Sequence, residues 1–258
     1  EGLPTLLLAL QDSDPLVKQT AIRALRDLAD REAEKPLLAM VEDDDKTTRL
    51  LVAEALANVA GPETEEQLLK RLNSGEYSHA DSLIYALAKI DPTGHRELFE
   101  RIIARPDFSY AGKRSAILGL GMIEDEKVVQ TLIGFLRTTI MISMKDDDIV
   151  PYIQALGNIG HSGAYEEFAK LMTQANWRLR SEIIKAMGNI PDRIALVHII
   201  KALEDSNGWV QLAALEAFNH YFNIHFKFMG TEKDLKFVAS MIGYLKKFRL
   251  IQLADKRF

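Results

Sequence analysis

One short pattern recurs along this chain at a nearly constant spacing. A small residue followed by a bulky apolar residue occurs seven times, and we call the small residue the anchor of its repeat. The seven pairs are Ala24-Leu25, Ala55-Leu56, Ala86-Leu87, Gly119-Leu120, Ala155-Leu156, Ala186-Met187 and Ala217-Phe218. The anchors are spaced 31, 31, 33, 36, 31 and 31 residues apart. Self-similarity at a period of this length indicates a protein built of stacked repeats.

Apolar residues around each anchor follow helical spacing. The positions two before, one after and four after the anchor lie on one face of an α-helix, and these positions are occupied by apolar residues. The position two before holds Ile22, Ala53, Ile84, Ile117, Ile153, Ile184 and Leu215, and the position four after holds Leu28, Val59, Ile90, Ile123, Ile159, Ile190 and Tyr221. Gly61, Pro62, Pro92 and Pro191 follow such helices and are expected to end them.

A further helix is expected before each anchor-bearing helix. Its apolar positions include Leu6, Leu37, Leu68, Phe168 and Ile199, and then Leu10, Val41, Leu72, Met172 and Leu203. Each repeat is thus a hairpin of a first and a second helix, which needs its neighbours to cover its apolar faces. Glycine stands two residues after the anchor at Gly121, Gly157 and Gly188. We expect it to let neighbouring helices approach closely, which offsets its cost of about 1 kcal/mol in helix propensity.

Three stretches of the chain carry a family resemblance. "DSDPLVKQTAIRALRDLAD" (12–30), "DDIVPYIQALGNIG" (147–160) and "WRLRSEIIKAMGNI" (177–190) resemble HEAT-type repeats, and are most similar to the short repeats of phycobilin-lyase-like proteins. The similarity covers residues 4–223. It implies an all-α fold, an α-α superhelix (HEAT-like solenoid) of about seven helical hairpins plus a C-terminal capping helix. Residues 1–226 would form the solenoid, and residues 227–258 the basic capping helix on the last repeat.

The resemblance also implies a structural role for charged residues near the turns. A basic residue stands six before the anchor at Lys18, Arg49, Lys113 and Arg180. In such repeats this cation ties adjacent turns through acidic residues, here Asp12, Asp14, Asp43 and Asp45.

Composition limits the partners of the chain. Its 258 residues carry a net charge of −5, yet residues 227–258 hold eight basic and three acidic side chains, so the remainder is acidic. An acidic body disfavours binding to nucleic-acid phosphates. The absence of cysteine excludes disulfides and thiolate metal sites, and it fits a cytoplasmic protein. The start, "EGLPTLLLAL", has neither an initiator methionine nor a signal peptide, so we expect the chain to be a piece of a longer protein.

No residues with the spacing of a reaction centre are found. None of the six histidines precedes a glutamate, so the His-Glu metal motif of HEAT-like deoxyhypusine hydroxylases is missing. No two histidines stand four residues apart, the helical spacing that zinc sites use. We therefore expect no metal, no cofactor and no catalytic residue, and hence a protein that is not an enzyme. Trp177 and Trp209 are expected to pack against the repeats.

The second helices offer the most informative surface. The resemblance implies that these helices line the concave side, where such proteins hold their partners. The position one before the anchor, with those five before and three after, should form an exposed ridge. Its expected partner-binding residues are Tyr85, Leu118, Met122, Val150, Gln154, Asn158 and Lys185. An apolar spot at Leu118 and Met122 among polar residues suits a protein-binding hot spot, unless the irregular spacing nearby buries both side chains.

Two further segments could contact a partner. Residues 138–145 fall in the longest spacing; they either lengthen a first helix, with Ile140 and Met144 packing on a neighbour, or form a loop at the edge of the groove. The helix expected near 232–253 is apolar on both sides. Either this helix is unusually buried, or its outer stripe contacts a second copy in a homodimer, or a following domain, through Phe237, Met241, Tyr244, Phe248 and Ile251.

These observations favour one function and leave two alternatives. The chain is predicted to be a non-catalytic protein–protein interaction scaffold or regulatory module that binds a protein or peptide on its concave face. One alternative is a phycobilin-lyase-like protein that assists tetrapyrrole attachment. The other is a nucleic-acid-binding HEAT-like protein, which the acidic body disfavours.

Overall fold

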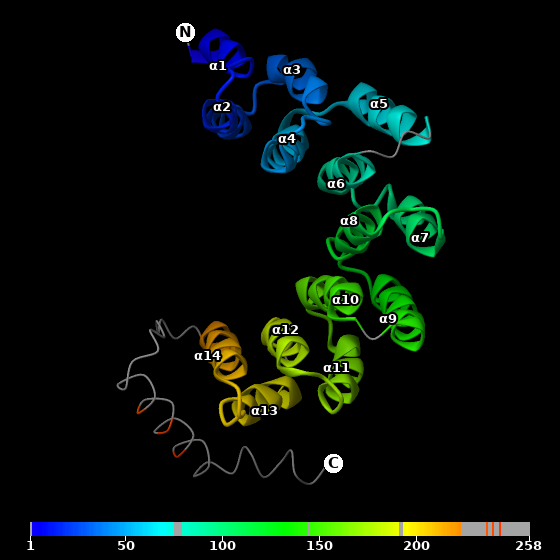
Figure 1. Ribbon diagram of the computed structural model, residues 1–258, viewed down its shortest axis with the longest axis vertical. Coiled ribbons are helices and arrows are strands. Elements are labelled where there is room, and N and C mark those ends of the chain that lie inside the picture. The colour runs from blue at the N-terminus through cyan, green and yellow to red at the C-terminus, as the bar shows by residue number, and fades with distance from the viewer. Residues whose placement is uncertain are drawn as a thin grey trace. The chain divides into compact units, whose positions relative to one another are not determined.

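The protein is described by a computed structural model, shown in Figure 1. The structure describes residues 2–74, 79–143, 145–190 and 193–222, and beyond them only residues 236, 239 and 243; of Arg193, Ile194, Tyr221 and Phe222 it describes the backbone. Every regular element in this part of the chain is helical. The all-α prediction is confirmed. None of these helices is long and apolar enough to cross a membrane.

The helices form seven successive hairpins within the described residues. The first helices are α1 (Gly2–Ala9), α3 (Glu34–Ala39), α5 (Pro62–Asn73), α7 (Arg96–Ala104), α9 (Glu126–Ile142), α11 (Tyr165–Met172) and α13 (Arg193–Ala202). The second helices are α2 (Pro15–Leu28), α4 (Lys46–Val59), α6 (Ala80–Ile90), α8 (Tyr110–Leu120), α10 (Asp146–Ile159), α12 (Trp177–Gly188) and α14 (Gly208–Phe222). Short 3-10 helices, η1 (Arg31–Ala33) and η2 (Ser162–Ala164), precede α3 and α11.

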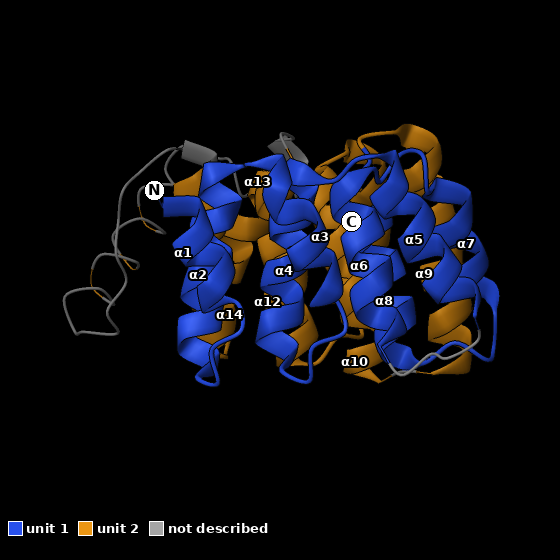
Figure 2. Ribbon diagram, turned by 90° about the horizontal axis from the view of Figure 1, so that it is seen from above, with its two compact units in different colours: residues 1–123 blue, residues 124–258 orange. Residues whose placement is uncertain are grey.

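The chain divides into two compact units, residues 1–123 and residues 124–258, coloured separately in Figure 2. Unit 1 contains α1 to α8, and unit 2 contains α9 to α14. In each unit the second helices pack side by side in one layer, and each first helix packs on the second helix of its own hairpin (Figure 1). The apolar core of each unit lies between the two layers.

The predicted core positions are buried with few exceptions. The residues two before and one after the anchor are buried in all seven repeats. Of those four after the anchor, Val59, Ile123 and Ile190 are buried, but Leu28 is exposed. The prediction is wrong at Leu28 because α2 packs against a second helix on one side only, whereas α4 has such neighbours on both sides.

Neighbouring second helices make close contact through pairs of small residues. A methyl group built on Gly157 would lie 2.6 Å from Cβ of Ala186, and one on Gly188 would lie 2.8 Å from Cβ of Ala217. A methyl group on Gly119 would lie 3.0 Å from Cβ of Ala88. In each pair, the residue two after one anchor meets the next anchor, and one member is glycine. The role expected of Gly157 and Gly188 is confirmed, while Gly121 caps the end of α8.

Basic residues six before the anchor hold the turns of adjacent repeats. Lys18 Nζ lies 3.3 Å from Asp43 Oδ2, and Arg180 donates two hydrogen bonds of 2.9 and 2.8 Å to Asp205. The buried Arg49 donates to Ser82 Oγ in the next repeat at 2.8 Å and to the carbonyl oxygen of Asp43 at 2.7 Å. These three cations therefore have the structural role that the family resemblance implied.

Residues 138–142 of the segment 138–145 lengthen a first helix. Helix α9 continues to Ile142 and has 17 residues, so the helical alternative is confirmed. Ile140 is half-buried, whereas Met141 and Ile142 are exposed at the end of the helix. Met144 lies outside the described residues.

We expect Gly157→Ala to lower the free energy of unfolding by about 1 kcal/mol. The new Cβ would also lie 2.8 Å from the backbone Cα of Ala186, so the two helices would have to move apart. Such overpacking costs about 1–3 kcal/mol, which exceeds the gain in helix propensity of up to about 1 kcal/mol. Gly134→Ala is the control, because a methyl group there meets nothing within 4 Å and should stabilise α9. Urea unfolding measures the free energy of unfolding of both variants. If Gly157→Ala stabilised the protein as much as Gly134→Ala, a small residue at position 157 would not be needed for packing.

We expect Ala29→Gly to stabilise the protein by about 0.5–1 kcal/mol. Ala29 ends α2 with φ 52° and ψ 35°, a left-handed conformation that disfavours a residue with a Cβ. Gly160 holds the equivalent position after α10, with φ 65°. Gly160→Ala should cost more than about 1 kcal/mol, because its Cβ would also lie 2.7 Å from the Asn189 carbonyl oxygen. Thermal unfolding should show a higher melting temperature for Ala29→Gly and a lower one for Gly160→Ala than for the parent chain. A lower melting temperature for Ala29→Gly would contradict the strain assigned to Ala29.

We expect Asp205→Asn to reduce stability at neutral pH by about 1–3 kcal/mol, since it removes a charge-assisted, two-bond pair with Arg180. Burial raises the pKa of Asp205, but hydrogen bonds from Arg180 and from the Asn207 N–H outweigh it and lower the pKa below its usual value. The stabilisation is therefore present above about pH 4 and is lost at lower pH, as Asp205 becomes protonated in the folded protein.

Denaturant unfolding at neutral pH and near pH 3 should show the difference between the parent chain and Asp205→Asn shrinking with acid. Asp147→Asn is the control, because its 3.2 Å pair with Arg178 is exposed and should contribute about 0.5 kcal/mol or less. A difference at Asp205 that stays constant with pH would contradict the ionic origin of the effect.

Candidate interaction surface

The position one before the anchor is open to solvent in every repeat. Arg23, Lys185 and Glu216 are exposed, and Glu54, Tyr85, Leu118 and Gln154 are half-buried. The residues on either side of this position around the helix are the one two before the anchor and the anchor itself; all of them are buried except the half-buried anchor Ala24. Each second helix thus turns one row of residues toward solvent, and we call this row the ridge of its unit.

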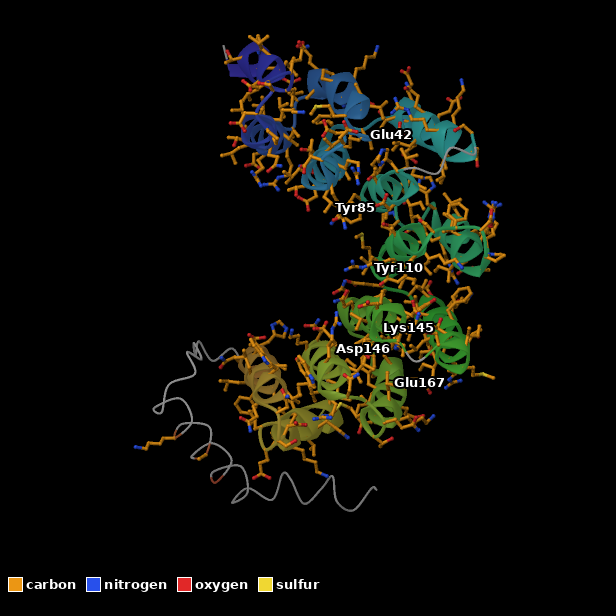
Figure 3. The ribbon with its side chains drawn as sticks, in the orientation of Figure 1. Glu42, Tyr85, Tyr110, Lys145, Asp146 and Glu167 are labelled. Carbon is orange, nitrogen blue, oxygen red and sulfur yellow. The ribbon has the colours of Figure 1, made fainter. Side chains whose placement is uncertain are left out.

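In unit 1 the ridge carries an aromatic ring and an apolar spot. Lys89 Nζ lies 5.3 Å from the centre of the Tyr85 ring, a cation–π contact on α6. Figure 3 shows Tyr85 on the side of α6 away from α5. Leu118 on α8 and Met122 are both half-buried, and Arg114 beside them is exposed. The apolar spot is thus partly accessible to a partner.

The helical spacing expected at Met122 is wrong. Helix α8 ends at Leu120, and the Met122 N–H donates to the carbonyl oxygen of Gly119 at 3.1 Å in the turn that follows. Gly121 ends the helix there, so Met122 belongs to the turn and not to the face of the helix.

In unit 2 the ridge is mainly polar. Val150 and Gln154 are half-buried, and Lys185 is exposed. Glu182 Oε2 accepts a hydrogen bond of 3.1 Å from the Gln154 side chain, and Glu182 Oε1 lies 3.1 Å from Lys185 Nζ. Glu182 thereby orients two of the predicted site residues. Sequence reasoning missed it, although its place three residues before Lys185 on a helix is the spacing of an ion pair.

Asn158 occupies a position that has a structural role in other repeats. Three residues after the anchor, Asn58 donates to the Arg26 carbonyl oxygen at 3.0 Å, and Asn189 donates to the Gly157 carbonyl oxygen at 3.1 Å. Each bond ties a second helix to the second helix of the preceding repeat in its unit. Asn158 is exposed, and its role in binding stays a prediction.

Titratable side chains on the first helices also join neighbouring repeats. The Glu34 carboxylate accepts from the Gly61 N–H at 2.8 Å and from the Thr64 hydroxyl, and hydrogen bonds from Thr64 and Gly61 lower the pKa of Glu34. Glu65 Oε2 lies 3.1 Å from His95 Nε2. Among the described residues, no three His, Asp or Glu side chains come together as a metal site. The carboxylates of this layer hold repeats together.

Two further predictions concern aromatic residues. Trp177 and Trp209 are 46% and 63% exposed at the starts of α12 and α14, so the expectation that they pack against the repeats is wrong for much of their surface. Each lies at the first turn of a second helix, and the following residue Val210 is buried while Trp209 is exposed. The predicted contact residues Phe237, Met241, Tyr244, Phe248 and Ile251 lie outside the described residues, as does the boundary predicted between residues 226 and 227.

Comparison with known proteins gives the family of the chain. The family model described as HEAT repeats matches residues 3–88 and 151–219, more than half of the chain. No curated protein sequence matches. The chain is similar in structure to the complex of CpcE and CpcF of phycocyanin lyase from Nostoc sp. PCC7120, with 17% identity, 93% of each chain covered and a TM-score of 0.47.

Two other solved structures show a similar level of likeness. Human deoxyhypusine hydroxylase is 16% identical, with 86% of this chain and 84% of that chain covered and a TM-score of 0.42. A designed armadillo repeat protein in complex with the peptide (KR)4 is 20% identical, with 85% and 100% covered and a TM-score of 0.36. The matched family model and the seven hairpins agree: the chain belongs to the HEAT repeat family.

Proposed function

We propose that the chain is a non-catalytic binding module that captures a protein or peptide partner on the ridges of its second helices. The observation that carries the proposal is the row of solvent-accessible residues at the same position of every repeat, bordered on both sides by residues that are buried except for the half-buried Ala24. In each unit, an open row on the packed layer of second helices presents side chains at the regular intervals of the repeats. HEAT proteins are repeat scaffolds, and stacked repeats of this kind form extended binding surfaces.

The ridge of unit 1 would provide the main affinity. Leu118 on α8 and Met122 in the turn that follows would together form the apolar spot, and Arg114, one helical turn before Leu118 on α8, is exposed. Apolar side chains that a partner covers can contribute to binding, and tyrosine and arginine, here Tyr85 and Arg114, are enriched among the few residues that dominate the binding free energy of an interface. We expect the partner to place an apolar side chain on this spot and an acidic group near Arg114.

The ridge of unit 2 would provide polar contacts. Glu182 fixes Gln154 and Lys185 through bonds of 3.1 Å, so these side chains lose little conformational entropy when a partner binds. Polar groups ordered in this way select the partner by hydrogen bonding, as the polar rim of an interface does.

The double variant Leu118→Asp with Met122→Asp should keep its fold and lose partner capture. Both residues are half-buried, so circular dichroism and the melting temperature should change little, while binding should weaken by more than about 30-fold, the loss typical of hot-spot residues. Affinity capture from the native source with mass spectrometry identifies the partner, and calorimetry with the purified pair measures its Kd.

Met141→Asp is the matched control for this experiment. Met141 is an exposed apolar residue at the end of α9, outside either ridge, so its substitution should leave the Kd unchanged. Loss of binding by Met141→Asp alone would move the partner to α9. Unfolding of the double variant would instead show that Leu118 and Met122 belong to the core.

A further inference from the structure

The second helices of unit 1 lie side by side, with like parts next to each other. Near the start of α4, Asp45 accepts a hydrogen bond of 3.0 Å from the side chain of Gln19 on α2. Near the end of α4, Asn58 donates at 3.0 Å to the carbonyl oxygen of Arg26, which is near the end of α2. The two helices therefore run parallel and in register, and α6 and α8 continue the same layer. Because packed helices lie about 8–10 Å apart, the ridge residues of unit 1 follow one another at about this interval.

The first two positions of the unit 1 ridge are oppositely charged. Arg23 on α2 is exposed, and within the described part of the chain no acidic side chain pairs with it. Lys185 is also exposed at this position, although α12 has a second helix on both sides, so the exposure of Arg23 does not depend on the place of α2 in the stack. Glu54 Oε2 on α4 lies 3.4 Å from Arg26 Nη1, and Arg26 is shared with Asp27. The Glu54 carboxylate therefore keeps lone pairs for a further donor.

The next two positions of this ridge are aromatic and aliphatic. Tyr85 on α6 is half-buried, and Figure 3 shows it on the side of α6 away from α5. Lys89 Nζ lies 5.3 Å from the centre of its ring, a contact that holds the ring in place. Leu118 on α8 is half-buried as well. From α2 to α8 the ridge thus presents a cation, a carboxylate, an aromatic ring and an aliphatic side chain.

The interval between these positions selects the conformation of a bound segment. In a β-strand successive side chains point to opposite faces, so residues three apart, at about 10 Å, face opposite ways. In the polyproline II conformation, which has three residues per turn, every third side chain points the same way at intervals of about 9 Å. This interval matches the separation of the second helices. An α-helix binds through an apolar face in an apolar groove, whereas two of the four ridge positions are charged.

We propose that the ridge of unit 1 binds a proline-rich segment in the polyproline II conformation. This inference rests on the proposed function and names the chemistry of the partner. Every third residue of the segment contacts one second helix: an acidic residue at Arg23, a basic residue at Glu54, a proline at Tyr85 and an aliphatic residue at Leu118. The prolines between them keep the segment extended before it binds, so little conformational entropy is lost. A proline ring packs on the tyrosine, since aromatic side chains are the usual receptors of this conformation.

A synthetic peptide of ten residues tests the spacing on the full chain. It has aspartate, lysine and leucine at its first, fourth and tenth positions and proline elsewhere, and the anisotropy of a fluorescent label reports its binding. The comparison peptide has one additional proline between the lysine and the leucine, which turns the leucine by about 120° away from the ridge. We expect the comparison peptide to bind at least about tenfold more weakly, because it cannot reach Glu54 and Leu118 together.

Charge reversal at Glu54 tests which residue of the peptide lies there. Glu54→Lys should weaken binding of the ten-residue peptide about tenfold, and replacing the lysine of the peptide by glutamate should restore it. The ion pair between Glu54 and Arg26 is open to solvent and contributes little to stability, so circular dichroism should show an unchanged fold. Glu216→Lys is the matched control, because Glu216 holds the same position in unit 2 and its substitution should leave the Kd unchanged.

Equal affinity for the two peptides, binding of neither, or no recovery with the glutamate peptide would overturn the inference. Tighter binding of an alanine-rich helical peptide that presents the same residues seven positions apart would also overturn it, since a helix would then be the occupant. In each of these cases the proposed function still holds if Leu118→Asp with Met122→Asp abolishes capture of the native partner. The proposed function itself fails if that double variant keeps both its fold and its partner.

Discussion

The fold depends on how closely two second helices can approach each other. Gly157 against Ala186 and Gly188 against Ala217 leave no space for one more methyl group, and Ala88 against Gly119 is nearly as close. At this separation the apolar residues on both sides of the anchor interlock and are buried. Hydrogen bonds such as the one from Asn189 to the Gly157 carbonyl oxygen also become possible. The small residue is thus the condition for the other contacts between repeats.

Most polar groups near the repeat boundaries take part in stacking. Arg49, the one buried charged residue among those described, bonds to Ser82 and to backbone carbonyls. Glu34 is held by Gly61 and Thr64, and Asp205 by Arg180. The buried polar side-chain atoms of the described residues all have partners, as expected of well-packed repeats.

The sequence predicted the periodic part of the structure well. A period of 31 residues determines which residues face a neighbour, so the core positions followed from counting along the chain, whereas the role of the turn cations was implied by the family resemblance. The prediction from the period was wrong at Leu28, because no preceding second helix packs on α2 in this chain. It was also wrong at Met122, because α8 ends at Leu120, before it reaches that residue. The exposure of Trp177 and Trp209 could not be predicted, because residue type alone does not show which side of the first helical turn a neighbouring repeat covers. Glu182 was missed because it is an acidic residue in a column that carries no shared chemistry.

The ties between repeats join residues only 25 to 33 positions apart, as between Lys18 and Asp43 or between Arg49 and Ser82. Chains dominated by such short-range contacts fold quickly, because little chain entropy is lost before the first favourable contacts form. Ordering can begin at any hairpin and spread to its neighbours, and a hairpin with a neighbour on one side only frays before one that is held on both sides. Each unit of this chain can therefore gain or lose a repeat at its edge without refolding of the remainder.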